Sequence, residues 1–396
     1  MASKSIFILG AKRTPFCGFA GPFRTLPASH VYAAAAKEAI RTANVDPNFI
    51  DTTVVGNVNF LSQCDGGKTP RYCGIYSGVP LDRPALGVNK ACGTGLQTII
   101  SGALDILTGS AKITLVGGTE LMSALPLLVR NVRFGTIIGV SYHVEDHIKK
   151  LFPDSYTGFT LQDMAEKVAK RYNITRADVD EFAAQSHLKW KAAQDAKVFD
   201  NELVTMTVKD GDKEIVVNKD LLPQPTISAA ELSKLPTLLD NGEVITSGNS
   251  IAPADGAAAL LIGGEDSVKN HNLKPLARVA GWACVGVDPL DTAIAAVPAV
   301  TKLLADQKLT VNDIDLFEIN ETFAAQALAT VKELQLDPTK VNVSGGSLAI
   351  GHPIAATGAR MATHLVHELG RRNLKRGIAA SSCGGGQGVA VLLERI

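Results

Sequence analysis

Four residues of this 396-residue chain have side chains that can cooperate in covalent chemistry. Two are cysteines next to glycines, Cys92 in VNKACGTGLQ and Cys383 in AASSCGGGQG, and the others are His352 and Asn320. A thiolate is a strong nucleophile, a helix N-terminus lowers the pKa of a thiol, and a nearby imidazole can take up its proton. Glycines beside a cysteine expose backbone N–H groups that can stabilise an oxyanion. These residue types therefore predict nucleophilic catalysis by cysteine, provided that the fold brings them together.

The elements that must position these residues occur twice along the chain. Apolar residues after Cys92 recur with helical spacing, Gly109 is a plausible stop, and KITLVGGTE (112–120) has the pattern of a buried strand. The same order returns later, where the strand-like KVNVSGG (340–346) and KRGIAASSCGGG (375–386) flank a second helical pattern. The buried faces predicted for the two helices are Leu96, Ile99, Ile100, Ala103, Leu104 and Leu107 in the first, and Gly358, Met361, Ala362, Leu365, Val366 and Leu369 in the second.

Three pairs of positions are separated by nearly the same number of residues: Leu96 and Gly358, Lys112 and Lys375, and Asp51 and Asp315. This regular offset indicates an internal duplication of a βα-rich half. The offset also makes Cys383 equivalent to Glu120. Because ligands bind beyond the carboxyl ends of strands in α/β sheets, the four candidate residues should project from strand ends and meet if the halves pack face to face.

The predicted fold class is therefore layered α/β, with two duplicated halves. Residues 1–121 and 249–271 are assigned to the first half, and residues 272–396 to the second. Residues 122–248 interrupt the repeat and are interpreted as an inserted loop domain with helices of its own.

The composition narrows the classes of protein to which the chain can belong. Lys+Arg and Asp+Glu number 39 each, so nothing points to a nucleic-acid or membrane-surface protein. No apolar run approaches the ~20 residues of a membrane span, and no CxxC pair suggests a zinc site. We therefore predict no integral membrane segment and no metal. The remaining cysteines are interpreted as inert packing residues, namely Cys17, Cys64, Cys73 and Cys284.

The motifs NKACGTG, INETFA, GGSLAIGHPIAATGAR and SSCGGGQG, in this order, resemble those of the thiolase family. ILGAKRTPF near the start and SGNSIAPADGAAA before the second half also match that family, so the resemblance spans the whole chain. It implies a fold in which the inserted loop domain covers coenzyme A (CoA). It also implies acyl-CoA and CoA as substrates, no permanently bound cofactor, and pairing of subunits as a homodimer or homotetramer.

The resemblance also implies a role for each candidate residue. Cys92 corresponds to the nucleophile that becomes acylated, His352 to the histidine that activates it, and Cys383 to the acid/base cysteine. Asn320 corresponds to a residue that positions a water, which forms one oxyanion hole together with the histidine. The N–H groups of Cys92 and Gly385 would form the other. The implied reaction is thiolytic cleavage of a 3-ketoacyl-CoA by CoA, which runs backwards as a Claisen condensation.

The chain departs from the family pattern where CoA is expected to bind. Gln224 and Ile227 stand where arginine and threonine are usual, and Ile251 replaces a serine, although Ser250 lies one position away. NETF also replaces the common NEAF, which puts Thr322 where alanine is usual. These departures predict weakened CoA binding rather than altered chemistry.

Basic residues elsewhere could compensate for these losses. Arg130 and Arg133 in RNVRFG are alternative partners for the CoA phosphates, although this stretch could equally be a solvated face.

Two other functions compete with this interpretation. A β-ketoacyl synthase-like condensing enzyme would share the duplicated fold and the nucleophilic cysteine. Such an enzyme typically uses two histidines, whereas the second partner here is Cys383. A non-catalytic acyl-CoA or lipid-binding protein on the same fold would explain the altered CoA stretch but not the retention of all four catalytic residue types.

The N-terminal segment suggests a compartment. The first 37 residues contain no acidic residue but five basic ones: Lys4, Lys12, Arg13, Arg24 and Lys37. This composition resembles a mitochondrial targeting segment, yet SIFILGAKRTPF also looks like the first strand of the fold. We therefore expect mitochondrial import without cleavage, with a cytoplasmic location as the alternative.

Overall fold

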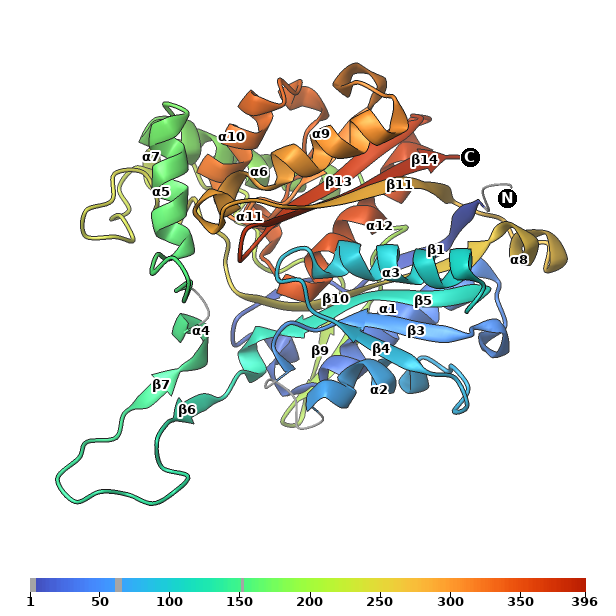
Figure 1. Ribbon diagram of the computed structural model, residues 1–396, viewed down its shortest axis with the longest axis horizontal. Helices are drawn as coiled ribbons and strands as arrows, with labels where there is room; N and C mark the ends of the chain where they lie inside the picture. The colour runs from blue at the N-terminus through green and yellow to red at the C-terminus, as the bar shows by residue number, and fades with distance from the viewer. Residues whose placement is uncertain (1–4, 61–65, 151–152) are drawn as a thin grey trace.

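The β-strands of both halves join in one sheet. The computed structural model describes residues 5–60, 66–150 and 153–396, and within them ten strands form the order β4–β3–β5–β10–β1–β11–β14–β13–β12, with β2 paired to β10 (Figure 1). The first half contributes β1 (Ile6–Arg13), β2 (Cys17–Gly18), β3 (Thr52–Gly56), β4 (Ala85–Val88), β5 (Ile113–Leu121) and β10 (Ala254–Gly264). The second half contributes β11 (Ala277–Gly286), β12 (Leu316–Ile319), β13 (Arg376–Cys383) and β14 (Gln387–Arg395).

The predicted duplication is present in the structure. In each half, a parallel pair (β3 with β5, β12 with β13) lies next to a strand of opposite direction, β10 or β14. The same side-chain bond recurs before each pair. Asp51 Oδ2 accepts the backbone N–H of Lys112 at 2.8 Å, and Asp315 Oδ2 accepts that of Lys375 at 2.8 Å. The two halves therefore repeat a local bonding pattern as well as a strand order.

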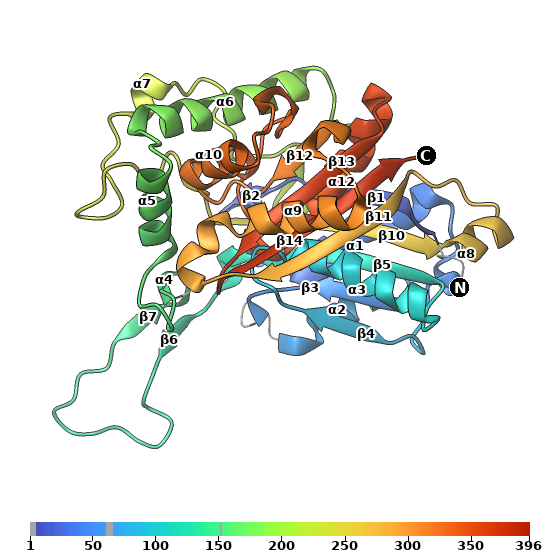
Figure 2. The same ribbon diagram turned by 45° about the horizontal axis from the view of Figure 1, so that its top comes forward.

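Two central helices lie between the half-sheets. α3 (Thr94–Thr108) and α12 (Ile354–Arg372) pack against each other and share one apolar core with β5, β10, β13 and β14 (Figure 2). α1 (Ala28–Ala43) and α2 (Thr69–Tyr76) cover the outer face of the first half, and α9 (Ala296–Gln307) covers that of the second, beside α10 (Ala324–Glu333). The expected face-to-face arrangement is thus found. α3 and α12 form the middle layer, and the pairing of β1 with β11 joins the strands of the two halves.

The helical faces predicted from spacing are largely correct. All six predicted positions of α12 are buried, and so are the first four of α3. Leu104 and Leu107 were predicted to be buried and are instead 45% and 39% exposed. They lie near the end of α3, where Ile106 takes the core-facing position before the helix ends at Gly109 in a left-handed conformation (φ 81°).

The prediction of a strand at KVNVSGG (340–346) is wrong. The structure has only an isolated bridge there, between Val341 and Phe317. Asn342 takes a positive φ of 44°, and its side chain bonds to both the N–H and the C=O of Ile319. The asparagine amide thus replaces ladder bonds that a continuing strand would make. The chain then runs through α11 (Ser347–Ile350) to His352.

One cysteine prediction needs correction. Cys17 and Cys73 are buried in the core, as predicted, whereas Cys284 is exposed. Burial along β11 fades toward its C-terminal end, where Cys284 lies. The position of Cys64 is outside the described residues.

A long segment separates β5 from its sheet neighbour β10. It begins with an arm built on β6 (Leu127–Val129) and β7 (Val144–Asp146), which projects from the body of the molecule (Figures 1 and 2). The elements that follow are α4 (His147–Lys150), α5 (Leu161–Arg171), α6 (Arg176–Asp195), β8 (Met206–Asp210), β9 (Lys213–Val217) and α7 (Ala229–Leu232). Thr160 and Thr175 cap α5 and α6 in reciprocal capping boxes, which explains where these helices begin. After β10, α8 (Glu265–Asn270) leads to the second half.

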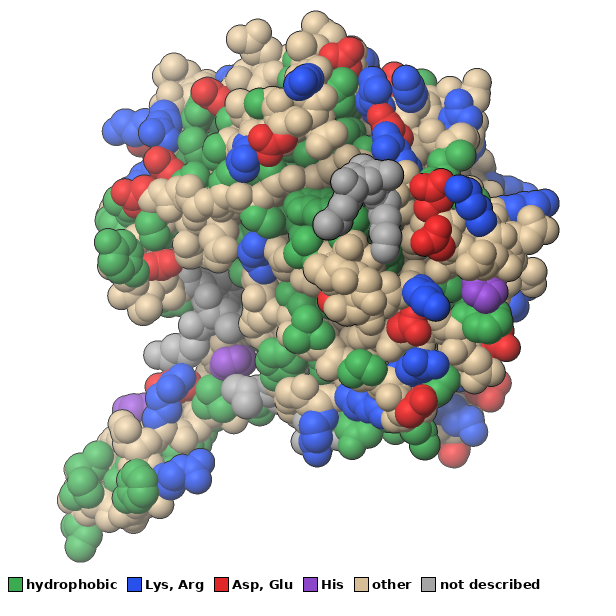
Figure 3. Space-filling view, turned by 45° about the vertical axis from the view of Figure 1, so that its right-hand side comes forward, with side chains coloured by type: hydrophobic (Ala, Val, Ile, Leu, Met, Phe, Trp, Pro, Cys, Tyr) green, Lys and Arg blue, Asp and Glu red, His purple; other side chains and the backbone are tan. Residues whose placement is uncertain are grey.

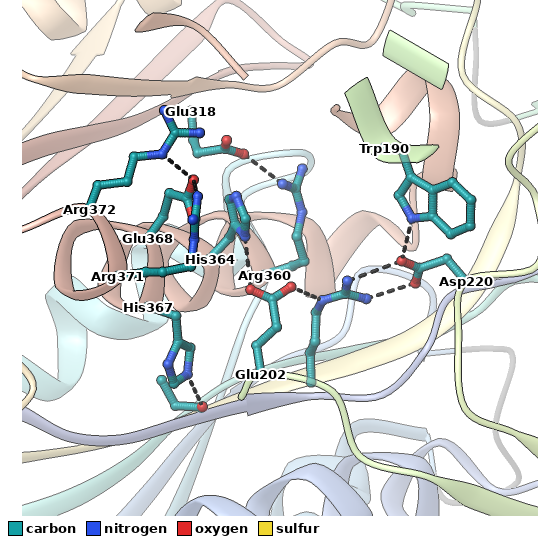
Figure 4. A network of polar contacts seen from close by, with 12 residues as sticks. Trp190, Glu202, Asp220, Glu318, Arg360, His364, His367, Glu368, Arg371 and Arg372 are labelled. Atoms are coloured by element: carbon teal, nitrogen blue, oxygen red, sulfur yellow. Dashed lines mark hydrogen bonds and ion pairs between the residues drawn. The ribbon is translucent and has the colours of Figure 1, made fainter. Parts of the chain in front are cut away.

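A buried charge network ties this segment to both halves (Figure 4). Arg13 of β1 is 1% exposed and pairs with Glu202 and Asp220 of the inserted segment, each at 2.7 Å. Glu202 also contacts His364 of α12 at 2.8 Å, and Asp220 accepts the indole N–H of Trp190. Every charge in this cluster has a partner, which buried charges require.

The described part of the chain contains no helix long and apolar enough to cross a membrane.

Candidate active site

Cys92 lies in a tight turn between β4 and α3. Ala91 before it has a positive φ of 45°, which is a strained conformation for a residue with a side chain. Thr94 holds the turn, because its hydroxyl accepts the N–H of Lys90 at 2.8 Å and donates to the C=O of Ala91 at 2.6 Å. The turn places the half-buried Cys92 on the wall of a cavity, at the N-terminus of α3.

Cys383 lies beside this turn. It is the last residue of β13, and a Cβ atom on Gly93 would stand 2.4 Å from its Sγ. Only glycine therefore fits at position 93. The surroundings of the two thiols are reciprocal: the backbone N–H of Gly384 acts on Cys92 and that of Gly93 acts on Cys383, and each acts to lower the pKa of that thiol. Each sulfur is thus near the backbone N–H of the residue that follows the other cysteine.

Both thiols are harder to ionise than an ordinary cysteine. Burial raises the pKa of Cys92 to about 11, although the N–H groups of Gly384 and of Cys92 itself act in the opposite direction. Burial, followed by the neighbouring Cys92, raises the pKa of Cys383 further. The expectation that a helix N-terminus yields a low-pKa thiol is therefore outweighed by desolvation. A nucleophilic Cys92 needs a base to remove its proton.

His352 is suited to be that base. Its Nδ1 lies 2.6 Å from the hydroxyl of Thr357, and that hydroxyl donates to the C=O of Pro353 at 3.1 Å. The threonine oxygen consequently accepts from Nδ1–H, which leaves Nε2 with a free lone pair. Nε2 is buried without a partner in the described structure, and His352 lines the same cavity as Cys92. Burial, then the nearby Arg360, lowers the pKa of His352 to about 3, so the ring is neutral.

The cavity holds about 400 Å³ and is mostly apolar. Besides Cys92 and His352 it is lined by Val58, Ala91, Met122, Leu161, Gln162, Leu238, Ser247, Ser250, Ile251, Ala252, Pro253, Thr322, Phe323, Ile354 and Gly384. A smaller hollow continues past Cys92 and is bounded by Leu161, Met164, Thr292, Ala293, Thr322, Phe323, Gln326, Ser382 and Gly384. The described residues include no cluster of three side chains that could hold a metal ion.

Asn320 lies at the end of β12, directly behind this wall. Its Oδ1 accepts from the hydroxyl of Ser347 at 2.8 Å, and its Nδ2 donates to the hydroxyl of Thr322 at 3.3 Å. Asn320 is fully buried and is not among the cavity-lining residues, whereas Thr322 is. Asn320 is therefore connected to the cavity wall only indirectly, through its hydrogen bond to Thr322.

The residues predicted to contact CoA are placed unequally. Ser250 and Ile251 line the cavity. Gln224 and Ile227 are not among its lining residues: Gln224 is exposed, with its N–H bonded to His187, and Ile227 packs against the core of the inserted segment.

The remaining predicted positions are exposed. Gly385, next to Gly384, has a φ of 80°. Arg130 and Arg133 line a hollow on the arm, and Arg130 pairs there with Glu145.

Sequence reasoning missed Thr357 and the part played by Thr322. The first carries a weak signal, a hydroxyl five residues after His352 in the opening turn of a predicted helix. The second is one of the departures from the family motif.

A duplicated α/β fold, with Cys92 and a neutral imidazole lining one cavity and a second thiol, Cys383, buried behind Gly93 and outside the lining, is characteristic of one family of enzymes. The chain belongs to the thiolase family: the thiolase N-terminal domain matches residues 6–266 and the thiolase C-terminal domain matches residues 273–395. The predicted family and fold class are thereby confirmed.

Among individual proteins, the chain is similar to the mitochondrial 3-ketoacyl-CoA thiolase of Bos taurus, with 40% identity over 99% of this chain and 98% of that protein. It is 38% identical to a probable acetyl-CoA acyltransferase of Staphylococcus aureus (strain COL), over 98% of this chain and 99% of that protein. The crystal structure of human mitochondrial 3-ketoacyl-CoA thiolase in complex with CoA superimposes with a TM-score of 0.96 and 39% identity, covering 99% and 98% of the two chains.

Proposed function

We propose that the protein is an acetyl-CoA C-acyltransferase that cleaves 3-ketoacyl-CoA with CoA, giving acetyl-CoA and a shortened acyl-CoA. One observation carries the proposal: in a thiolase-family chain, Cys92 and His352, whose Nε2 has no partner among the described residues, line one cavity, and Cys383 is buried against the residue that follows Cys92. CoA acts as a co-substrate, and the chemistry needs no resident cofactor.

In the first half-reaction, His352 Nε2 takes the proton of Cys92, and the sulfur attacks the 3-keto carbon. The N–H of Cys92, with that of Gly384 or Gly385, faces the developing oxyanion. Collapse of the tetrahedral intermediate breaks the C2–C3 bond, and Cys383 protonates C2 of the departing acetyl-CoA enolate. The acyl group remains on Cys92 as a thioester.

In the second half-reaction, CoA enters as a thiol. Its proton passes to the Cys383 thiolate, and its sulfur attacks the Cys92 thioester. The Cys92 thiolate then leaves and recovers its proton from the His352 imidazolium, which releases the shortened acyl-CoA. Both cysteines and the histidine return to their starting protonation states, and the reverse sequence forms a carbon–carbon bond.

The two competing functions fit the site less well. A synthase-like enzyme would need a second histidine where Cys383 lies, and a binding protein would have no need of a buried histidine with a free nitrogen facing the cavity. Mixing the enzyme with acetoacetyl-CoA should give a burst of acetyl-CoA and an acetyl group on Cys92. The Cys284→Ala variant, which removes an exposed cysteine, serves as the control and should behave as the native protein. Absence of both the burst and the adduct would sink the proposal.

We further propose that Ser250 and Ile251 contact the CoA arm, since both line the cavity. The missing polar groups at positions 224, 227 and 251 should raise the KM for CoA about tenfold to a hundredfold with kcat preserved, because a lost hydrogen bond costs ~1 kcal/mol or more. Restoring Gln224→Arg, Ile227→Thr and Ile251→Ser together should lower that KM. Because only position 251 lines the cavity, Ile251→Ser alone tests whether the two other sites matter.

Two features favour self-association as a homodimer or homotetramer. β4 is the last strand of the sheet in its half among the described residues, and Leu86 on it is 51% exposed. The projecting arm carries Phe134 and Ile138, whose side chains are completely exposed, and Figure 3 shows hydrophobic groups gathered at its tip. Sedimentation equilibrium distinguishes a dimer or tetramer from a monomer.

We also propose a mitochondrial location, which the names of the mitochondrial relatives support and the bacterial relatives do not. β1 begins at Ile6 and lies in the middle of the sheet, so removal of the N-terminal segment would damage the fold. Cell fractionation tests this, and recovery of the protein entirely in the cytosol would refute it.

A further inference from the structure

Thr322 holds a position that the proposed mechanism does not use. It lines both the main cavity and the smaller hollow beside Cys92, and it is only 8% exposed. It also stands where the related motif usually has alanine, so its hydroxyl is a feature of this chain.

The hydroxyl of Thr322 differs from the other hydroxyls around Cys92. Three of them donate to backbone carbonyls and so have committed protons: Ser250 to Thr246, Thr292 to Pro289, and Ser382 to Ala293. Ser247 is exposed at the cavity mouth, where water can bind it.

Thr322 uses its oxygen as an acceptor for Asn320, and its own proton has no acceptor among the described residues. It is therefore the buried hydroxyl beside the reactive thiol that is free to donate.

The hydrogen bonds behind Thr322 use its hydroxyl oxygen as an acceptor, which leaves the hydroxyl proton available for donation. Ser347 donates to Asn320 at 2.8 Å, and Asn320 donates to Thr322 at 3.3 Å. A chain of hydrogen bonds running in one direction polarises its last member, which here belongs to a residue that lines the cavity. Because Asn320 itself does not line the cavity, it acts on a bound substrate through Thr322.

We propose that Thr322 is a further catalytic residue, whose hydroxyl donates a hydrogen bond to the thioester oxygen of the acetyl-CoA enolate. This inference rests on the proposed thiolase function. The negative charge on that oxygen appears only when the enolate forms, by cleavage of the C2–C3 bond or by removal of a proton from C2, so a donor fixed in place beforehand stabilises the transition state selectively. The hydroxyl thereby takes the place that the family resemblance assigns to a water held by Asn320. No proton is transferred in this step, since Cys383 supplies the proton to C2.

The test separates steps that form the enolate from steps that do not. Acetylation of Cys92 by acetyl-CoA proceeds through a tetrahedral intermediate only, whereas cleavage of acetoacetyl-CoA, and exchange of the methyl protons of acetyl-CoA with D₂O, require the enolate. Thr322→Val keeps the shape and removes the hydroxyl. We expect it to lower cleavage and exchange by about 100-fold, a typical loss for one oxyanion donor, and to change acetylation by less than about threefold.

Two further variants complete the set. Thr322→Ser should recover most of the cleavage rate, and Thr322→Ala should fall between serine and valine, because water can enter the space that it leaves. Thr330→Val removes another buried threonine hydroxyl, which donates to Gln326 one turn earlier in α10, and is the matched control.

The proposal is overturned if Thr322→Val cleaves within about twofold of the native rate, or if cleavage and acetylation fall equally. If Thr322→Val does not fold, the comparison of Thr322→Ser with Thr322→Ala decides in the same way. Failure of the native protein to acetylate Cys92 would instead refute the proposed function itself.

Discussion

Equivalent positions in the two halves have been put to different uses. Glu120, one residue before the end of β5, pairs with Gly256, and Cys383 at the end of β13 pairs with Gln387, each eight positions into its strand. Each side chain meets the N-terminus of the central helix of the opposite half. Glu120 accepts the N–H of Ala355 in α12, and Cys383 lies close to Gly93 before α3, whose N–H acts to lower its pKa.

The side chains at the two positions differ in their hydrogen bonding. The carboxylate of Glu120 also accepts N–H groups from Val58 and Asn59, each at 3.0 Å. Burial raises its pKa to about 7 against the effect of these donors. Cys383, which like Glu120 is not a cavity-lining residue, makes fewer bonds and lies against Gly93, the residue that follows Cys92. The same corner of the fold therefore holds a structural anchor in one half and, in the proposed mechanism, the acid/base group in the other, and the amount of hydrogen bonding distinguishes them.

The largest effects should come from the cysteines. Cys92→Ala should abolish thiolysis and acyl-enzyme formation, whereas Cys383→Ala should lose cleavage and keep some acetylation by acetyl-CoA, because protonation of C2 comes after attack at the carbonyl. Mass spectrometry of each variant mixed with acetyl-CoA measures the adduct. An acetyl group on Cys383 and none on Cys92 would reverse the two assignments.

Thr357→Val should give the next largest effect. Without the hydroxyl, Nδ1 of His352 loses its partner and the imidazole is free to place its proton on Nε2, which could then no longer accept one. A positioned general base typically contributes about 100-fold to 10,000-fold, so loss of the correct tautomer should lower both acetylation of Cys92 and cleavage by about 100-fold or more. Thr357→Ser should restore both. A variant that folds normally and acetylates at the native rate would contradict the assigned tautomer.

Glu120→Ala tests the structural side of the comparison. It leaves three buried N–H groups without an acceptor, so we expect the free energy of unfolding in urea to fall by about 2–4 kcal/mol. Cys383→Ala should change the same quantity by ~1 kcal/mol or less. Equal destabilisation by the two variants would mean that Cys383 is as much an anchor as Glu120.

The smallest effects should come from the positions that the halves share. Asp51→Ala and Asp315→Ala each remove an acceptor for the first backbone N–H groups of the following segment. Each should cost ~1 kcal/mol in the free energy of unfolding, and the two costs should be similar because the bonds are alike. If the two costs differ severalfold, the same hydrogen-bond geometry contributes differently to the free energy of unfolding in the two halves.

Local patterns predicted most of the fold, because apolar spacing and glycines report the conformation of a short stretch. They could not show where the end of a helix extends past the elements that cover it, so Leu104 and Leu107 were wrongly assigned to the core. They also could not reveal partners that are far apart in sequence: Arg13 and Glu202 are 189 positions apart. The motifs predicted that Cys92 and Cys383 lie close together, as the structure has them, and their catalytic roles stay predictions. The tautomer of His352 and the free proton of Thr322 depend on hydrogen-bond direction, which only coordinates supply.

The charge network around Arg13 has a consequence for how substrates come and go. Swinging the inserted segment away from the halves would separate Arg13 from Glu202 and Asp220 and break these buried ion pairs. The pairs would have to break and re-form in every catalytic cycle if the segment worked as a hinged lid. We therefore expect the cavity to act as a fixed slot, which substrates enter and leave along the same path while the segment stays in place. The rates of substrate entry and product release should then depend on the width and hydration of the slot rather than on a domain movement.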